Sequence, residues 1–292
     1  MAPKDGTGQA QAARAGEPVV VALRDGRRIA ARYWPGDGAP LVLLHGLLDS
    51  CEGWDGLCLA TTRPCLAVDL PGFGGSDGAT RPRISAFADA VAELLVRLDV
   101  RGCRLVGHSL GGAVATAVAE RAADRVASLV LLAPAGFGRI ALAEAASLPG
   151  VRDVTRLLLP LGLRSRAGLS WVYTAMVSNG EPPEPGLLER VVDHSGELVP
   201  GARAAVAAIA AAGLSEHAFH RRRVAYDGPV TVVWGERDRL VPPAHARGVR
   251  FALPQAECRV WPGMGHHPQR ERRADLLALL DAPAAAPAAR AA

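Results

Sequence analysis

Residues 103–121, CRLVGHSLGGAVATAVAER, carry the most informative pattern of the chain. It begins with a short apolar run that predicts a buried strand, and it continues into an alanine-rich segment that predicts a helix over residues 110–123. Between them, residues 107–111 read G-x-S-x-G at a strand-to-helix turn. Such a turn strains the serine backbone, and it needs glycines because a Cβ would collide with neighbouring main chain. The pattern predicts Ser109 as a nucleophile.

Strand and helix patterns alternate on both sides of this stretch. Apolar runs predict eight strands, at residues 19–24, 28–34, 41–44, 65–69, 103–107, 127–132, 229–234 and 257–261. The Asp25-Gly26 pair predicts a hairpin between the first two strands. Helical patterns lie between the later strands, at residues 84–98, 110–123, 243–251 and 272–280. This alternation predicts an α/β fold with an eight-stranded, mostly parallel, doubly wound sheet.

The alternation breaks at Pro134, which gives the expected domain organisation. Residues 137–225 show several helical segments and no strand pattern, so we expect a helical cap inserted after the sixth strand. Residues 18–136 and 226–281 are then the core. Residues 1–17 and 282–292 are polar or low in complexity, and we expect them to be disordered tails.

Composition excludes several classes of protein. The chain has 292 residues, 49% apolar and 21% charged, which fits one large domain or a domain with an insertion and excludes wholesale disorder. No apolar stretch is long enough to cross a bilayer, and the first twenty residues lack the apolar core of a signal peptide. We therefore expect a cytoplasmic protein with no membrane partner.

Charge and cysteine usage narrow the possible partners further. The net charge is +4, and the 33 basic residues are interspersed with 29 acidic ones, so we expect no nucleic-acid partner. The five cysteines show no C-x-x-C spacing. We expect them to be free thiols in a reducing compartment, with neither a disulfide framework nor a structural metal site.

A serine nucleophile needs a base, and the base needs an orienting acid. Asp238 lies just after the seventh predicted strand, and His266 follows the last one. Because the carboxyl ends of parallel strands meet at one edge of the sheet, we expect Ser109, Asp238 and His266 to converge there as a catalytic triad. Glu236 stays open as the alternative acid, and His267 as the alternative base.

Acyl transfer also requires donors for an oxyanion. The first turn of the predicted helix offers the backbone N–H of Leu110. The loop after the third strand offers the N–H of Leu47, next to His45-Gly46. We expect His45 to orient that loop and His108 to be structural. Loss of one such donor typically costs about 3–4 kcal/mol of transition-state stabilisation.

Five motifs, in this order, make the chain resemble the α/β-hydrolase-fold proteins that carry a helical cap. They are LVLLHGLLDS (41–50), DLPGFGGS (69–76), GHSLGG (107–112), GERDRLVP (235–242) and GMGHHPQRE (263–271). The resemblance implies Ser109 as nucleophile, Asp238 as acid and His266 as base, with the cap covering the pocket and selecting the substrate.

A further segment, LVLLAPAGFG (129–138), is similar to the hydrolase-like domain of some 2-oxoacid-dehydrogenase acyltransferase components. Those proteins carry a lipoyl domain ahead of it. Only 18 residues precede the first predicted strand here, so we expect that domain to be absent.

The expected function is that of a serine hydrolase. It would cleave a carboxylic ester or thioester of a small, mostly apolar substrate through an acyl-enzyme, with no cofactor and no metal. A serine at position 109 argues against dehalogenases and epoxide hydrolases of this fold, which use an aspartate nucleophile. A carbon–carbon bond hydrolase, a lyase or an acyltransferase could use the same triad. A ligand sensor on the same fold is the non-enzymatic alternative.

Overall fold

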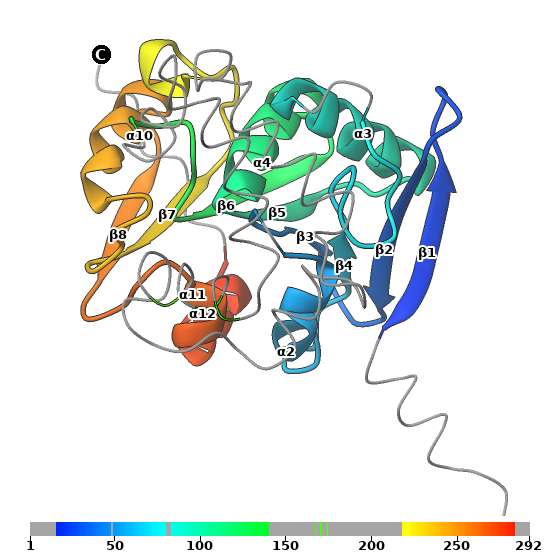
Figure 1. The fold of residues 1–292 in the computed structure, drawn as a ribbon, viewed down its shortest axis with the longest axis horizontal. Coiled ribbons are helices and arrows are strands. Elements are labelled where there is room, and N and C mark those ends of the chain that lie inside the picture. The colour runs from blue at the N-terminus through cyan, green and yellow to red at the C-terminus, as the bar shows by residue number, and fades with distance from the viewer. Residues whose placement is uncertain are drawn as a thin grey trace, which may run out of the picture.

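An eight-stranded sheet forms the centre of the molecule (Figure 1). The structure is a computed structural model that describes residues 16–47, 49–79, 83–139 and 218–283, with residues 167, 170 and 174. The strands are β1 (Glu17–Ala22), β2 (Arg28–Trp34), β3 (Leu41–Leu44), β4 (Cys65–Val68), β5 (Cys103–His108), β6 (Val126–Leu132), β7 (Val230–Gly235) and β8 (Glu257–Trp261).

The strand order is β1-β2-β4-β3-β5-β6-β7-β8. β1 pairs with β2, and β2 with β4, in antiparallel fashion, while the pairs from β4 to β8 are parallel. This confirms the predicted fold class, because eight strands form within two residues of their expected starts and the first two make a hairpin. The chain crosses over between β4 and β5 to place β3 in the middle of the sheet.

Helices cover both faces of the sheet (Figure 1). α3 (Ile84–Arg97), α4 (Leu110–Arg121) and α10 (Ala246–Ala252) pack on one face. α2 (Asp55–Cys58) and α12 (Arg273–Asp281) pack on the other. Shorter elements connect them: η1 (Cys51–Trp54), η3 (Phe219–Arg221), η4 (Pro243–His245) and α11 (Pro268–Glu271). The sequence patterns predicted the longer helices but not η1, α2 or α11, which are one turn long.

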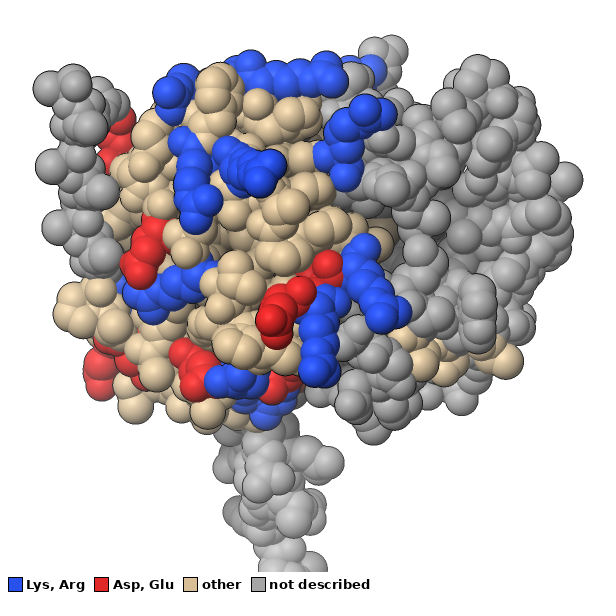
Figure 2. Space-filling view, turned by 90° about the vertical axis from the view of Figure 1, so that its left-hand side faces the viewer, with Lys and Arg blue, Asp and Glu red and all other residues tan. Residues whose placement is uncertain are grey.

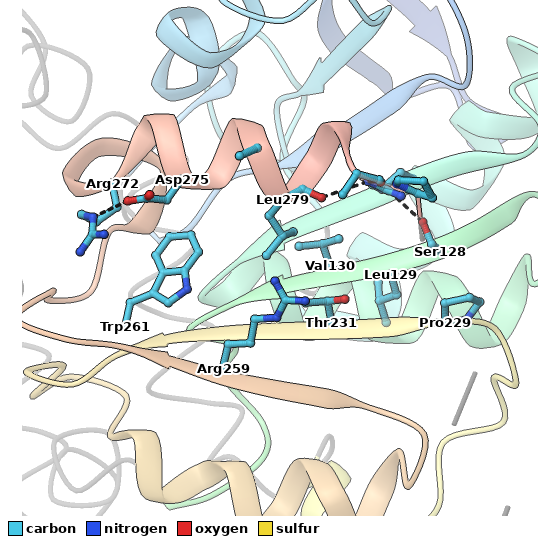
Figure 3. Close-up of a pocket in the computed structure, with 14 residues that line it drawn as sticks. Ser128, Leu129, Val130, Pro229, Thr231, Arg259, Trp261, Arg272, Asp275 and Leu279 are labelled. Carbon is cyan, nitrogen blue, oxygen red and sulfur yellow. Dashed lines mark hydrogen bonds and ion pairs between the residues drawn. The ribbon is translucent and has the colours of Figure 1, made fainter. Parts of the chain in front are cut away.

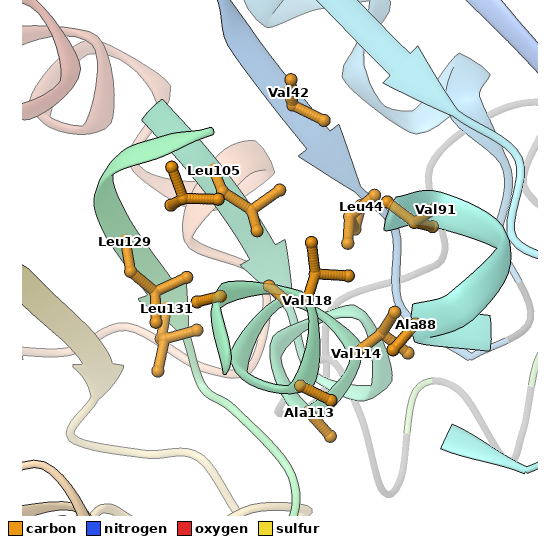
Figure 4. Packing of buried hydrophobic residues seen from close by; sticks show 14 of the residues in the cluster. Val42, Leu44, Ala88, Val91, Leu105, Ala113, Val114, Val118, Leu129 and Leu131 are labelled. Carbon is orange, nitrogen blue, oxygen red and sulfur yellow. The ribbon is translucent and has the colours of Figure 1, made fainter. Parts of the chain in front are cut away.

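The central strands are apolar on both faces because each face meets helices. In β3, Val42 and Leu44 join the cluster under α3 and α4, whereas Leu41 and Leu43 join the cluster under α2 and α12. Figure 4 shows the first of these clusters, with the strand side chains packed against Val114 and Val118 of α4. A close-packed interior of this kind has low compressibility, so its elements move little relative to one another. It therefore holds the carboxyl ends of β3, β5 and β7 in a constant relative position.

Parts of the predicted domain organisation fall outside the described residues. The segment expected to form the cap, residues 137–225, is described only at its two ends and at three single positions. The expected tails are described only from residue 16 onward and up to residue 283. Within the described residues, no helix has the length and apolar character that a membrane span requires.

The cysteines are free thiols, as predicted. Cys51, Cys58, Cys65 and Cys103 are buried and Cys258 is half-buried. Burial raises the pKa of the Cys103 thiol to about 12, so this side chain stays uncharged. These residues behave as small apolar side chains of the core.

Charged side chains of both signs share the surface in Figure 2, which views the molecule from the side of α10 and β8. On β8, Arg259 pairs with Glu257 at 2.8 Å. Just before α12, Arg272 pairs with Asp275. The interspersed charges predicted from the sequence are thus visible on this face.

Candidate active site

Ser109 occupies the turn between β5 and α4. Its φ is 52° and its ψ is −113°, a combination that non-glycine residues rarely adopt and that costs on the order of 1–3 kcal/mol. Its N–H donates to the Leu132 carbonyl at 2.9 Å, and its carbonyl accepts from Gly112 and Ala135. The residue as a whole is buried, with an exposed fraction of 8%. The strained turn predicted from the sequence is therefore present, and main-chain hydrogen bonds at both the N–H and the carbonyl of Ser109 hold it.

Two glycines allow this turn to form. A Cβ on Gly107 would lie 2.3 Å from the Gly111 carbonyl oxygen. A Cβ on Gly111 would lie 2.4 Å from the carbonyl oxygens of both Leu44 and His45. Neither position can hold a side chain without moving main chain, as the sequence analysis predicted. The second clash also shows that the end of β3 lies directly against the start of α4.

Asp238 and His266 meet at the carboxyl edge of the sheet. His266 Nδ1 lies 2.7 Å from Asp238 Oδ2, and both residues are buried. The other oxygen, Oδ1, accepts from the backbone N–H of Leu240 at 3.0 Å and of Val241 at 2.8 Å. Because a carboxylate oxygen accepts from the imidazole N–H that faces it, the proton of a neutral His266 lies on Nδ1. His266 Nε2 then keeps an unshared electron pair.

The alternatives left open by the sequence occupy other places. The Glu236 carboxylate accepts from the backbone N–H of Gly263 at 2.9 Å, on the exposed side of the loop. His267 is buried against the His108 ring, with centroids 4.8 Å apart, and it is His266 that contacts Asp238. Burial lowers the pKa of His267 well below the usual value for histidine, and the neighbouring His108 and His266 lower it further. His267 is therefore uncharged at neutral pH.

The loop between β3 and η1, described at residues 45–47 and 49–50, lies beside Ser109. A Cβ placed on Gly46 would come within 3.4 Å of the Ser109 Cβ. His45 fixes this loop, because its Nδ1 donates to the Gly46 carbonyl at 2.7 Å while its Nε2 accepts from the Leu70 N–H at 3.0 Å. Leu47 follows directly and is half-buried. The His45 contacts match the orienting role predicted for it.

Leu110 is the first residue of α4. The N–H groups of the first helical turn have no acceptor within their own helix, so the Leu110 N–H is available beside Ser109. The predicted pair of backbone donors, Leu47 and Leu110, thus lies on the two segments that flank the serine.

His108 links the serine turn to the histidine loop, residues 262–267. Its Nε2 donates to the His266 carbonyl at 2.8 Å, and the two rings lie 4.9 Å apart. Burial lowers the pKa of His108 well below its usual value, and the adjacent His266 adds to the effect. The hydrogen bond requires a proton on Nε2, and the lowered pKa of His108 leaves Nδ1 unprotonated. The sequence analysis gave His108 a structural role without identifying this partner.

Glu271 is a site residue that the sequence analysis missed. It lies at the end of α11, and its carboxylate accepts from the backbone N–H of Gly265 at 2.6 Å and of His267 at 2.9 Å. These two residues flank His266, so the carboxylate holds the main chain on both sides of the histidine. The motif GMGHHPQRE contained Glu271, but nothing in its spacing indicated that the side chain turns back onto the loop.

A groove of about 370 Å³ lies elsewhere, between α12 and strands β6 to β8 (Figure 3). Its three arginines already have partners: Arg104 donates to Ser128 Oγ and to main-chain carbonyls at the end of α12, Arg259 pairs with Glu257, and Arg272 pairs with Asp275. None of Ser109, Asp238 and His266 lines it. Because it lies along the sheet face rather than at the carboxyl edge, it is separate from the candidate active site.

Comparison with known proteins assigns the family. Residues 41–279 match the sequence profile described as the alpha/beta hydrolase family. The chain belongs to this family. Within the described residues, no group of three or more His, Cys, Asp or Glu side chains is arranged to hold a metal ion.

Relatives of this chain include proteins whose names give different reactions. The dihydrolipoyllysine-residue acetyltransferase component of the acetoin cleaving system of Pseudomonas putida is 34% identical over 237 residues, which is 80% of this chain and 60% of that protein. A 2-hydroxy-6-oxo-6-phenylhexa-2,4-dienoate hydrolase of Burkholderia cepacia is 25% identical over 251 residues, covering 81% of this chain and 84% of the relative. The chain thus spans about three fifths of the first relative and most of the second.

A solved structure extends the match to the whole fold. The crystal structure of a membrane phospholipase A, described as a bacterial virulence factor, superposes with a TM-score of 0.72 at 25% identity. The superposition covers 92% of this chain and 85% of that one. The sheet and helices described above are therefore those of the alpha/beta hydrolase fold.

Proposed function

We propose that the protein is a serine hydrolase that cleaves a carboxylic ester or thioester through Ser109, His266 and Asp238. The observation that carries the proposal is the buried 2.7 Å contact between His266 Nδ1 and Asp238 Oδ2, at the sheet edge where the strained Ser109 turn lies. A histidine held in this tautomer can act as a general base. In sites of this kind, it takes the proton of the serine hydroxyl on the strand-to-helix turn.

The proposed reaction has two halves. As Ser109 Oγ attacks the carbonyl carbon, His266 Nε2 takes its proton and Asp238 stabilises the imidazolium. The backbone N–H groups of Leu47 and Leu110 receive the oxyanion. The imidazolium then gives its proton to the departing alcohol or thiol, which leaves an acyl-enzyme. Water attacks that ester with His266 again as the base, and the proton returns to Ser109 Oγ as the acid product leaves.

The substrate is proposed to be a small, mostly apolar molecule. The proposal rests on the alanine- and leucine-rich composition of residues 137–225, which follow the sixth strand and so enter the fold at the carboxyl edge of the sheet. Every group the mechanism needs is a side chain or backbone N–H of the chain, so the proposed reaction uses neither metal nor cofactor.

Acyl transfer is the second candidate function. The relative from Pseudomonas putida that carries 34% identity is an acetyltransferase component, which favours this alternative. The acyl-enzyme would be the same, and an alcohol or thiol would take the place of water in the second half. The Burkholderia cepacia relative likewise keeps carbon–carbon bond hydrolysis as a variant of the same chemistry.

The test compares the wild type with Ser109→Ala. A fluorophosphonate probe should label the wild type and not the variant, and p-nitrophenyl esters of increasing chain length should be hydrolysed only by the wild type. If the protein is a hydrolase, added alcohols or thiols should leave the yield of free acid unchanged. If it is an acyltransferase, the acyl group should appear instead as a new ester or thioester of the added compound. A folded wild type that is neither labelled nor active on any ester would refute the proposal.

A further inference from the structure

A buried ion pair joins two loops of the candidate active site. Arg270 Nη2 lies 2.6 Å from Asp49 Oδ2, and the two side chains are only 9% and 8% exposed. Asp49 belongs to the β3–η1 loop, which runs past Ser109, and Arg270 lies on α11, directly after the histidine loop. The two residues are 221 positions apart in the chain. The pair is therefore a tertiary contact and not a feature of either loop alone.

Each end of the pair is itself tied to the groups around Ser109. On one side, Asp49 Oδ1 accepts from the Ser50 N–H at 2.9 Å, which shapes the end of the β3–η1 loop. On the other side, Arg270 is followed by Glu271, whose carboxylate accepts from Gly265 and His267, the two neighbours of His266. The ion pair thus connects the segment that carries Leu47 to the segment that carries His266.

Stability alone gives little reason for such a pair. Moving two charges out of water carries a desolvation cost that offsets most of their attraction, and apolar side chains of similar volume often serve as well. An ion pair does add a defined geometry, because a guanidinium and a carboxylate bond only in a narrow set of relative orientations. A pair between Asp49 and Arg270 therefore restricts how the β3–η1 loop and the start of α11 can lie relative to each other.

We propose that Asp49 and Arg270 are positioning residues, which hold the β3–η1 loop and the histidine loop in register for reaction at Ser109. The inference rests on the proposed function. The backbone donor of Leu47 and the base Nε2 of His266 must both reach one carbonyl group, and they come from these two loops. Loss of the pair therefore slows the chemical step more than it weakens substrate binding.

The charge of Arg270 has a second consequence nearby. It adds to the burial that lowers the pKa of His108 and of His267. Both rings contact His266, with centroids 4.9 Å and 5.2 Å away. In their neutral form they add no positive charge beside the base.

The decisive variant replaces the ion pair by apolar side chains, as Asp49→Leu with Arg270→Met. Single variants Asp49→Asn and Arg270→Gln, and the conservative Arg270→Lys, complete the series. Arg125→Gln is the matched control, because Arg125 is also a buried arginine that contacts a carboxylate, with its Nη1 3.3 Å from Asp99 Oδ1, but it lies at the amino end of β6. Each protein is measured for its melting temperature, its rate constant of fluorophosphonate labelling, and kcat and KM on a p-nitrophenyl ester.

We expect the apolar pair to melt within about 5 °C of the wild type, since buried ion pairs contribute little net stability. Its labelling rate and kcat should fall about 10- to 100-fold, the effect of a displacement of about 1 Å at a reacting group, with KM changed less than about threefold. Arg270→Lys should recover part of kcat. Arg125→Gln should lower the melting temperature and leave the labelling rate unchanged.

Two outcomes would overturn the inference while the proposed function survives. One is an apolar pair that is folded and labelled as fast as the wild type. The other is a loss of rate that follows the melting temperature equally in Arg125→Gln and in the loop variants. A folded wild type that is itself neither labelled nor active would instead refute the proposed function, and the inference would fall with it.

Discussion

Replacing Asp238 by asparagine tests whether the proposed triad depends on which ring nitrogen of His266 carries the proton. Asp238 Oδ1 accepts from two backbone N–H groups, Leu240 and Val241, at 3.0 and 2.8 Å. An asparagine must keep its carbonyl oxygen there, because its NH₂ group would otherwise face two donors. The NH₂ group therefore replaces Oδ2 and points at His266 Nδ1, 2.7 Å away in the wild type.

The expected size of the effect follows from this orientation. Because an NH₂ group can only donate, His266 must accept at Nδ1 and carry its proton on Nε2, where it cannot take the proton of Ser109. A base held in the wrong tautomer lowers kcat by about 10⁴-fold, which corresponds to about 5 kcal/mol of transition-state stabilisation. The melting temperature should change little, since the three hydrogen bonds persist with one reversed.

The assay is the rate of fluorophosphonate labelling together with kcat on the best p-nitrophenyl ester. Glu236→Gln is the matched control, because Glu236 is two residues away and binds only the Gly263 N–H within the described residues. It should retain kcat within about twofold. An Asp238→Asn protein that keeps more than a tenth of the wild-type kcat would refute the tautomer reasoning, and a large loss in Glu236→Gln would move the acid to that residue.

Three further predictions concern stability. His108 and His267 have pKa values well below that of an unfolded histidine, so only the unfolded chain binds protons at these residues as the pH falls. The free energy of unfolding should therefore decline below about pH 6.5, by up to about 1.4 kcal/mol per pH unit for each histidine. In urea titrations from pH 5 to 8, His267→Phe should make this decline shallower. Gly111→Ala should reduce both melting temperature and ester turnover because its Cβ would lie 2.4 Å from two carbonyl oxygens, whereas Gly78→Ala, which meets nothing within 4 Å, should change neither. Leu276→Ala, on the fully buried face of α12, should cost about 2–5 kcal/mol in denaturant unfolding with kcat unchanged; a loss below about 1 kcal/mol would mean that α12 packs more loosely than the structure indicates.

Much of the fold could be predicted because its signals are local. Buried parallel strands such as residues 41–44 are continuous apolar runs, and α3 repeats its apolar residues with helical spacing. Short elements carried no such signal. The single turns of η1, α2 and α11 are too brief for a period to show, and tertiary contacts stabilise them.

The candidate site divides in the same way. Ser109 was predictable from its neighbours, because a strained turn between strand and helix requires small residues on both sides. The sequence predicted Asp238 as the acid but left Glu236 open, since both follow β7 and lie two residues apart. The backbone donors of Leu240 and Val241 turn one carboxylate inward, while Gly263 holds the other outward.

Local sequence patterns were enough to predict the alternation of strands and helices, the serine turn, and the edge of the sheet where the acid and the base are expected. These follow from periodicity and from the chirality of the backbone, which act within a few residues. Three contacts became known only from the tertiary structure. His108 bonds to the His266 carbonyl, Glu271 accepts from the main chain of the histidine loop, and Asp49 pairs with Arg270, 221 positions away in the sequence. Contacts between distant segments depend on the packing of the whole core, which no local pattern encodes.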